Sequence, residues 1–111
     1  MNQDSYPENY KSIIGRYPKL AGALDELGSA IREEGPVEAK QVHLVQLAAA
    51  SAIRSEGAVH SHVRRALKAG ATAEEIRHTI ILLTSTIGFP TMAAALCWAE
   101  DIISDKPEKS G

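Results

Sequence analysis

The chain has 111 residues and a formal net charge of −2 at pH 7, with 44% hydrophobic and 23% charged residues. These values predict a single globular domain over 1–111, and they argue against a disordered chain or a strongly charged surface for nucleic acids or membranes. The single cysteine, Cys97, excludes an intramolecular disulfide. Only 5% of the residues are aromatic, so the core is expected to be aliphatic.

The two ends, 1–6 and 105–111, are polar and are expected to be loose. A polar start predicts no secretory signal peptide. No segment approaches the roughly 20 apolar residues that a membrane span needs. Together with the lone thiol, these features favour a cytoplasmic protein.

Glycine and proline divide the first part of the chain into helix-length segments. We expect a short helix over 7–14 with Gly15 as its C-cap, and a second helix that starts at Pro18 and ends at Gly35. Spacings of four, three and four place an apolar stripe on the second helix. Its members are Leu20, Leu24, Leu27 and Ile31.

The third predicted helix, over 37–55, is apolar nearly all round, which is typical of a central helix. We expect Gly57 to interrupt it. A fourth helix over 58–68 then follows, and Gly70 is a natural left-handed C-cap for it.

Thr72 and Glu75 have the spacing of a capping box and open a fifth helix that extends to Ile87. Its apolar stripe leaves Ile81 and Leu82 on other faces. The sequence Gly88-Phe89-Pro90 stops it, and a sixth helix follows over 91–104. Because no segment alternates with period two, we predict an all-α fold of about six helices.

The helices over 37–55 and 72–87 carry apolar residues on more than one face. One small core does not easily cover all of these faces. The sequence therefore predicts a homo-oligomer that buries the surplus apolar surface.

Four histidines, His43, His60, His62 and His78, are candidates for chemistry. His60 and His62 are two residues apart, which separates them by roughly 200° around a helix. They therefore cannot share one metal ion on a straight helix, and the dedicated zinc spacings are absent. No metal site is expected within one chain.

Ser55 precedes His62 by seven residues, so a Ser–His nucleophile pair is one reading if the helix is continuous. Glu56 either orients His62 or is a solvated surface acid. Cys97 stands among alanines, leucine and tryptophan, and is expected to be a buried small hydrophobe.

Three cations, Arg64, Arg65 and Lys68, lie near the C-terminal end of the fourth predicted helix. The more ordinary reading is a solvated face that matches the helix dipole. The functional reading is that one arginine holds a substrate carboxylate in a two-pronged geometry.

The stretch from 40 to 103 resembles the carboxymuconolactone decarboxylase family, which includes the AhpD-like alkylhydroperoxidases. The resemblance is carried by four segments in order: Leu44–Ala50, the run HVRRALKAGATAEEI from His62 to Ile76, the run IGFP from Ile87 to Pro90, and Met92–Leu96. It implies an all-helical fold that assembles into trimers or hexamers.

The redox branch of this family carries Cys-x-x-Cys-x-x-x-His, with a Glu twelve residues before the first Cys. His62 matches the histidine of that motif, whereas Ser55 and Ala58 stand at the cysteine positions and His43 at the Glu position. A dithiol cycle needs both thiols. The usual thiol-dependent peroxidase activity is therefore not expected.

The decarboxylase branch lacks the cysteine pair and uses no cofactor. By resemblance, His62 would carry the proton, His43 and Ser55 would share the site, and Arg64 or Arg65 would hold the carboxylate of a small substrate. This predicts cofactor-free decarboxylation or isomerisation. Two alternatives remain: an AhpD-like antioxidant protein, and a non-catalytic oligomer that binds a small molecule or a metal ion between chains.

A straight helix over 43–55 would place His43 about 18 Å along the axis from Ser55. The residues of the site therefore meet only through a bend, a break near Gly57, or a neighbouring subunit. A helix start near Gly57 would also lower the pKa of His62 through the helix dipole and favour the neutral ring.

Overall fold

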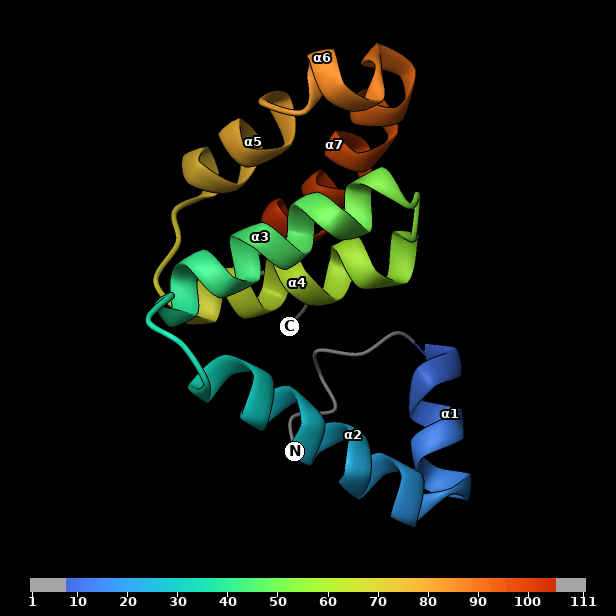
Figure 1. Cartoon of the computed structure of the whole chain (residues 1–111). Helices are drawn as coiled ribbons and strands as arrows, with labels where there is room; N and C mark the ends of the chain where they lie inside the picture. The colour runs from blue at the N-terminus through green and yellow to red at the C-terminus, as the bar shows by residue number, and fades with distance from the viewer. Residues whose placement is uncertain (1–7, 106–111) are drawn as a thin grey trace.

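The structure is a computed structural model that describes residues 8–105, and within that range it consists of seven helices and no strands (Figure 1). The all-α prediction is confirmed. The helices are α1 (Glu8–Arg16), α2 (Pro18–Glu33), α3 (Ala39–Ala52), α4 (Glu56–Lys68), α5 (Ala73–Ile81), α6 (Thr84–Ile87) and α7 (Phe89–Ile103). The ends expected to be loose lie outside the described residues except for Asp105, which follows α7. None of the described helices has the length and apolar character of a membrane span.

Helices α1 and α2 pack on each other and form an arm set apart from the other five helices (Figure 1). Pro18 occupies the first turn of α2, as predicted, because a first-turn proline sacrifices no helical hydrogen bond. Gly15 is not a C-cap, since α1 continues through it to Arg16. We call this pair the α1–α2 arm.

Helices α3 and α4 form an antiparallel hairpin (Figure 1). The break lies at residues 53–55, not at Gly57, which falls inside the first turn of α4. Arg54 adopts a left-handed conformation with φ 58°. The Ser55 Oγ then accepts a hydrogen bond from the Ala58 backbone N–H at 3.4 Å and so caps α4.

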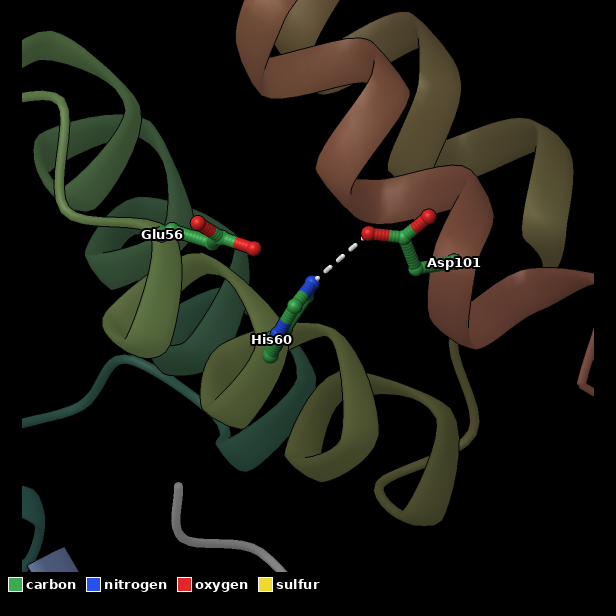
Figure 2. A group of neighbouring side chains, drawn as sticks. All are labelled: Glu56, His60 and Asp101. Atoms are coloured by element: carbon green, nitrogen blue, oxygen red, sulfur yellow. Dashed lines mark hydrogen bonds and ion pairs between the residues drawn. The ribbon is translucent and has the colours of Figure 1, made fainter. Parts of the chain in front are cut away.

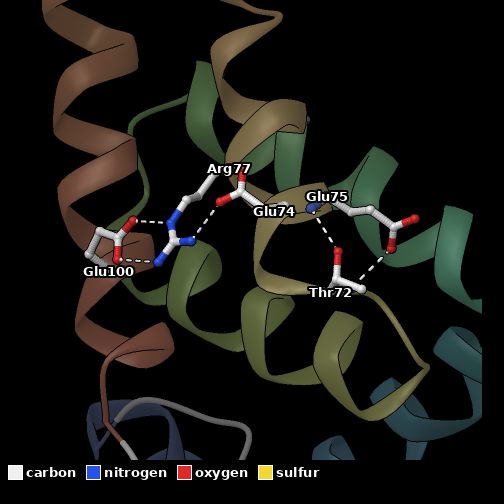
Figure 3. A network of polar contacts seen from close by, with 5 residues as sticks. All are labelled: Thr72, Glu74, Glu75, Arg77 and Glu100. Atoms are coloured by element: carbon white, nitrogen blue, oxygen red, sulfur yellow. Dashed lines mark hydrogen bonds and ion pairs between the residues drawn. The ribbon is translucent and has the colours of Figure 1, made fainter.

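The α4–α5 connection is built as the sequence predicts. Gly70 has φ 103°, which a residue with a Cβ adopts only at a cost. Thr72 and Glu75 form the complete capping box, with the Glu75 N–H donating to Thr72 Oγ1 at 3.0 Å and the Thr72 N–H donating to Glu75 Oε1 at 2.9 Å (Figure 3).

Arg77 joins α5 to α7 (Figure 3). Its Nε and Nη2 donate to the two carboxylate oxygens of Glu100 at 2.6 and 3.2 Å, and its Nη1 donates to Glu74 at 2.8 Å. The hydrogen bonds from Arg77 lower the pKa of Glu100 below its ordinary value. This two-pronged pair fixes the lateral position of α5 on α7.

The predicted fifth helix is shorter than expected, which corrects the bounds of two elements. Helix α5 ends at Ile81, and a tight turn with Leu83 N–H bonded to the Ile80 carbonyl precedes the four-residue α6. Gly88, at φ 88°, then redirects the chain into α7, which starts at Phe89 rather than after Pro90. Ile81 and Leu82 are exposed, as their places outside the stripe predict.

The core is aliphatic, as the composition predicts, and lies between α3, α4, α5 and α7. Its fully enclosed side chains are Leu47, Val59, Val63, Ala66, Ile76, Ile80, Ala95 and Ala99. The expectation that Cys97 is buried is wrong, since its side chain is exposed. Ala95 and Ala99 turn one face of α7 inward, and Cys97, two residues from each, lies roughly 200° around the helix from Ala95.

Candidate functional site

His43 of α3 and His62 of α4 come together across the helical hairpin. Their ring centroids are 6.0 Å apart, and the rings are inclined by 32°. His43 is buried, with 8% of its surface exposed, and His62 is half-buried. The break at residues 53–55 brings them together within one chain, so neither a bend nor a neighbouring subunit is needed.

Each ring holds an unused polar atom. Within the described part of the chain, the Nδ1 atoms of both His43 and His62 are buried and have no hydrogen-bond partner. Leaving a buried polar group unpaired costs about 1–3 kcal/mol. A small polar ligand with a donor or acceptor placed at these atoms would recover that free energy.

Both imidazoles are held in the neutral form at neutral pH. Burial, reinforced by Arg65 and His43, lowers the pKa of His62 to about 4. Burial, together with Arg65 and Arg32, also lowers the pKa of His43, against a hydrogen bond to Gln46 that raises it. The lowered pKa that was predicted for His62 is confirmed in direction, and its causes are burial, Arg65 and His43.

Arg65 is the cation that acts on both rings. It follows His62 by three residues, a spacing that places both side chains on one side of α4. Arg64 is also half-buried, but it is two residues from His62 and contributes to neither shift. The structure therefore joins His43, His62 and Arg65, with Arg32 of α2 acting on His43 from the arm.

Ser55 has a different local role from the one its spacing suggests. Its Oγ accepts the capping hydrogen bond at the start of α4. Among the described residues it does not pair with the Nδ1 of either His43 or His62. The Ser–His nucleophile pair therefore stays a prediction that these contacts do not support.

Sequence reasoning missed a second cluster, formed by Glu56, His60 and Asp101 (Figure 2). Glu56 is exposed, which agrees with the reading as a surface acid, and it lies beside His60 and does not contribute to the pKa shift of His62. The signal was present, since Glu56 and His60 are four residues apart and share one face of α4. The contribution of Asp101, from α7, is a tertiary contact that spacing along the chain does not reveal.

Comparison with known proteins agrees with the resemblance noted in the sequence. A family model, the carboxymuconolactone decarboxylase family, matches residues 18–101, which covers α2 through most of α7. No curated protein and no solved structure gives a significant match. The match begins well before residue 40, so it includes most of the α1–α2 arm that the sequence reading had left outside it.

Proposed function

The chain belongs to the carboxymuconolactone decarboxylase family, and from this and the paired imidazoles we propose that it performs cofactor-free acid–base chemistry on a small carboxylated molecule. The observation that supports the proposal is the pairing of two neutral imidazoles, 6.0 Å apart, each with a buried unpaired Nδ1. Neutral imidazoles are proton acceptors, and two of them together provide both a place to take a proton and a place to return it.

Arg65 supplies the carboxylate recognition in this proposal. Its positive charge acts on both rings and disfavours their protonation. A substrate carboxylate that pairs with Arg65 neutralises that charge and adds negative charge beside the rings. Substrate binding therefore raises the pKa of His62 toward neutrality, and a ring that is unprotonated in the free protein becomes able to hold a proton.

The decarboxylation step balances without a cofactor. The bond between the substrate carbon and its carboxyl group breaks, carbon dioxide leaves, and the electron pair remains on that carbon, stabilised by an adjacent carbonyl or double bond of the substrate. The proton on the His62 ring then bonds to the same carbon. Isomerisation would use the same residues, with His43 or His62 removing a proton from one carbon and returning it to another.

The test is a screen of small unsaturated carboxylic acids and lactone carboxylates with the full chain in D₂O. Decarboxylation releases carbon dioxide and places deuterium on the product carbon, whereas isomerisation gives exchange without carbon dioxide. We expect His62→Gln to lower kcat by at least about 100-fold, the scale of general acid–base catalysis. Arg65→Gln should mainly raise KM.

His78→Gln is the matched control, because His78 is an exposed histidine on α5. It should leave turnover unchanged. The proposal is overturned if no acid in the screen turns over, or if His62→Gln retains the activity that the wild-type chain shows.

The antioxidant alternative makes a distinct prediction about peroxide. Ser55 and Ala58 replace the two motif cysteines, and Cys97, the only cysteine, is exposed. We expect no turnover of hydrogen peroxide with a dithiol donor, and no difference between the wild type and Cys97→Ser. Robust turnover that disappears in Cys97→Ser would favour the antioxidant alternative and overturn the acid–base assignment.

A further inference from the structure

We propose that Glu56, His60 and Asp101 bind a divalent transition-metal ion of the zinc class at the junction of α4 and α7. Figure 2 shows the three side chains turned toward one another, with Glu56 and His60 from α4 and Asp101 from α7. One ligand atom from each residue lies within 4.8 Å of the other two.

The spacing of these atoms is close to that of a ligand set. His60 Nε2 and Asp101 Oδ2 are 3.0 Å apart. Two ligand atoms at the zinc distances of about 2.0–2.2 Å in tetrahedral geometry lie roughly 3.3 Å apart. An ion would therefore replace the present hydrogen bond with little movement, and Glu56 would need only a rotamer adjustment to close the set.

The charges also fit a divalent cation. One oxygen of each carboxylate lies within 4.8 Å of the other and of the His60 ring nitrogen. Within the described residues, Asp101 pairs with His60, whereas the Glu56 carboxylate has no hydrogen bond or ion pair. A divalent ion would balance the two negative charges and take the Nε2 of His60 as its third ligand.

The donor set selects the class of ion. An imidazole nitrogen favours zinc and its neighbours over magnesium or calcium, which prefer oxygen ligands only. Three protein ligands leave a fourth position for water, and that position faces solvent because Glu56 and Asp101 are exposed. The expected consequence is a tie between α4 and α7, which contact each other across the core.

This site is distinct from the proposed acid–base site. His60 and His62 are two residues apart on α4 and therefore lie roughly 200° apart around the helix. The inference does not depend on the proposed function, and it is an alternative to the expectation that one chain holds no metal site. It also differs from a metal shared between histidines of different chains, because all three ligands belong to one chain.

Equilibrium dialysis of the full chain against buffered free Zn²⁺, with millimolar Mg²⁺ present, tests the proposal. We expect one zinc ion per chain and a higher temperature of unfolding with zinc, because a ligand of the folded state stabilises it. His60→Gln, Glu56→Gln and Asp101→Asn should each weaken binding by at least about tenfold, since even outer-shell changes at metal sites cost 10–100-fold.

His78→Gln and His62→Gln are the matched controls and should bind zinc as the wild type does. Loss of binding in His62→Gln, retention in His60→Gln, or no binding by the wild type would each overturn the proposal. A measurement that needs no variant uses Co²⁺ with the wild-type chain. Its paramagnetic broadening should affect the ring signals of His60 more than those of His43 and His62, and the reverse order would overturn the assignment.

Discussion

Burial changes what an imidazole does at neutral pH, and His62 shows this effect most strongly. Its pKa is about 4 in the folded chain against an ordinary value of 6.5. A proton on this ring is disfavoured by desolvation of the charged form and by repulsion from Arg65. The residue is therefore suited to accept a proton only when an anion accompanies it.

The stability of the chain should depend on pH through His62. The unfolded chain binds a proton near pH 6.5 and the folded chain near pH 4. The unfolded state is therefore favoured progressively as the pH falls from about 6.5 to about 4, and the full contribution to stability is present above pH 6.5. We expect the free energy of unfolding at pH 5 to be about 1–2 kcal/mol lower than at pH 7, after allowance for solvent screening.

Urea titrations of the wild type and His62→Gln at the two pH values measure this term. The variant should lose less stability on acidification than the wild type, and His78→Gln should behave as the wild type does. Equal losses in wild type and His62→Gln would contradict the lowered pKa.

The sequence could predict His62 and His43 as site residues only through the family motif, because spacing on a straight helix separates them. The sequence did not reveal the turn at residues 53–55. Arg54 adopts a left-handed conformation there, and an arginine in the sequence does not predict that conformation. Arg64 and Arg65 were both candidates for holding a carboxylate. Only Arg65 is three residues from His62, the spacing that places two side chains on one side of a helix. Glu56 and His60 were separately visible, but their partner Asp101 is brought by α7.

At the scale of elements, three kinds of local signal were reliable: a proline in a first turn, a glycine with positive φ after a helix, and a capping box. Pro18, Gly70 and the Thr72–Glu75 box stand where the sequence predicts them. Glycine alone was a poor guide, since Gly15 and Gly57 lie inside helices. The division between α5 and α6 carries no proline or glycine, so tertiary packing decides it.

Thr72→Ala should destabilise the fold by about 1 kcal/mol, because the substitution removes the oxygen that accepts from the Glu75 N–H at 3.0 Å. Chemical denaturation measures the loss. Thr72→Ser keeps the oxygen and should restore most of the stability. Thr86→Ala, at an exposed threonine of α6, is the control and should change stability by less than about 0.5 kcal/mol. A loss from Thr86→Ala as large as that from Thr72→Ala would show that the cap is not the cause.

At the scale of the whole molecule, the apolar stripe on α2 is a large hydrophobic surface that the single chain leaves uncovered. The stripe exists as predicted, but its residues face outward, with Leu27 55% and Ile31 56% exposed. Surplus apolar surface was expected on the helices over 37–55 and 72–87. Val45 and Leu82, which lie in these ranges, are exposed. The α1–α2 arm adds a further exposed apolar surface, which the sequence analysis did not count among the surplus apolar faces.

We propose that further copies of the chain cover the arm and that the protein is a homo-oligomer. Sedimentation at micromolar concentration should show at least three chains. Leu27→Asp should dissociate the assembly, because a charge in an apolar interface is left without a partner. Glu26→Lys changes an exposed neighbour on the same helix and should leave the assembly intact. A stable wild-type monomer would contradict the proposal.

The placement of both imidazoles on one short helical hairpin also predicts an order of events during folding. Only three residues separate α3 from α4, so the chain entropy lost in bringing His43 beside His62 is small, and contacts this local form early. The core beside the hairpin also contains residues of α5 and α7, which are more distant along the chain, so we expect burial to be completed later. We therefore expect folding between about pH 4 and pH 6.5 to release a proton from His62, and acid to slow the step that buries this ring.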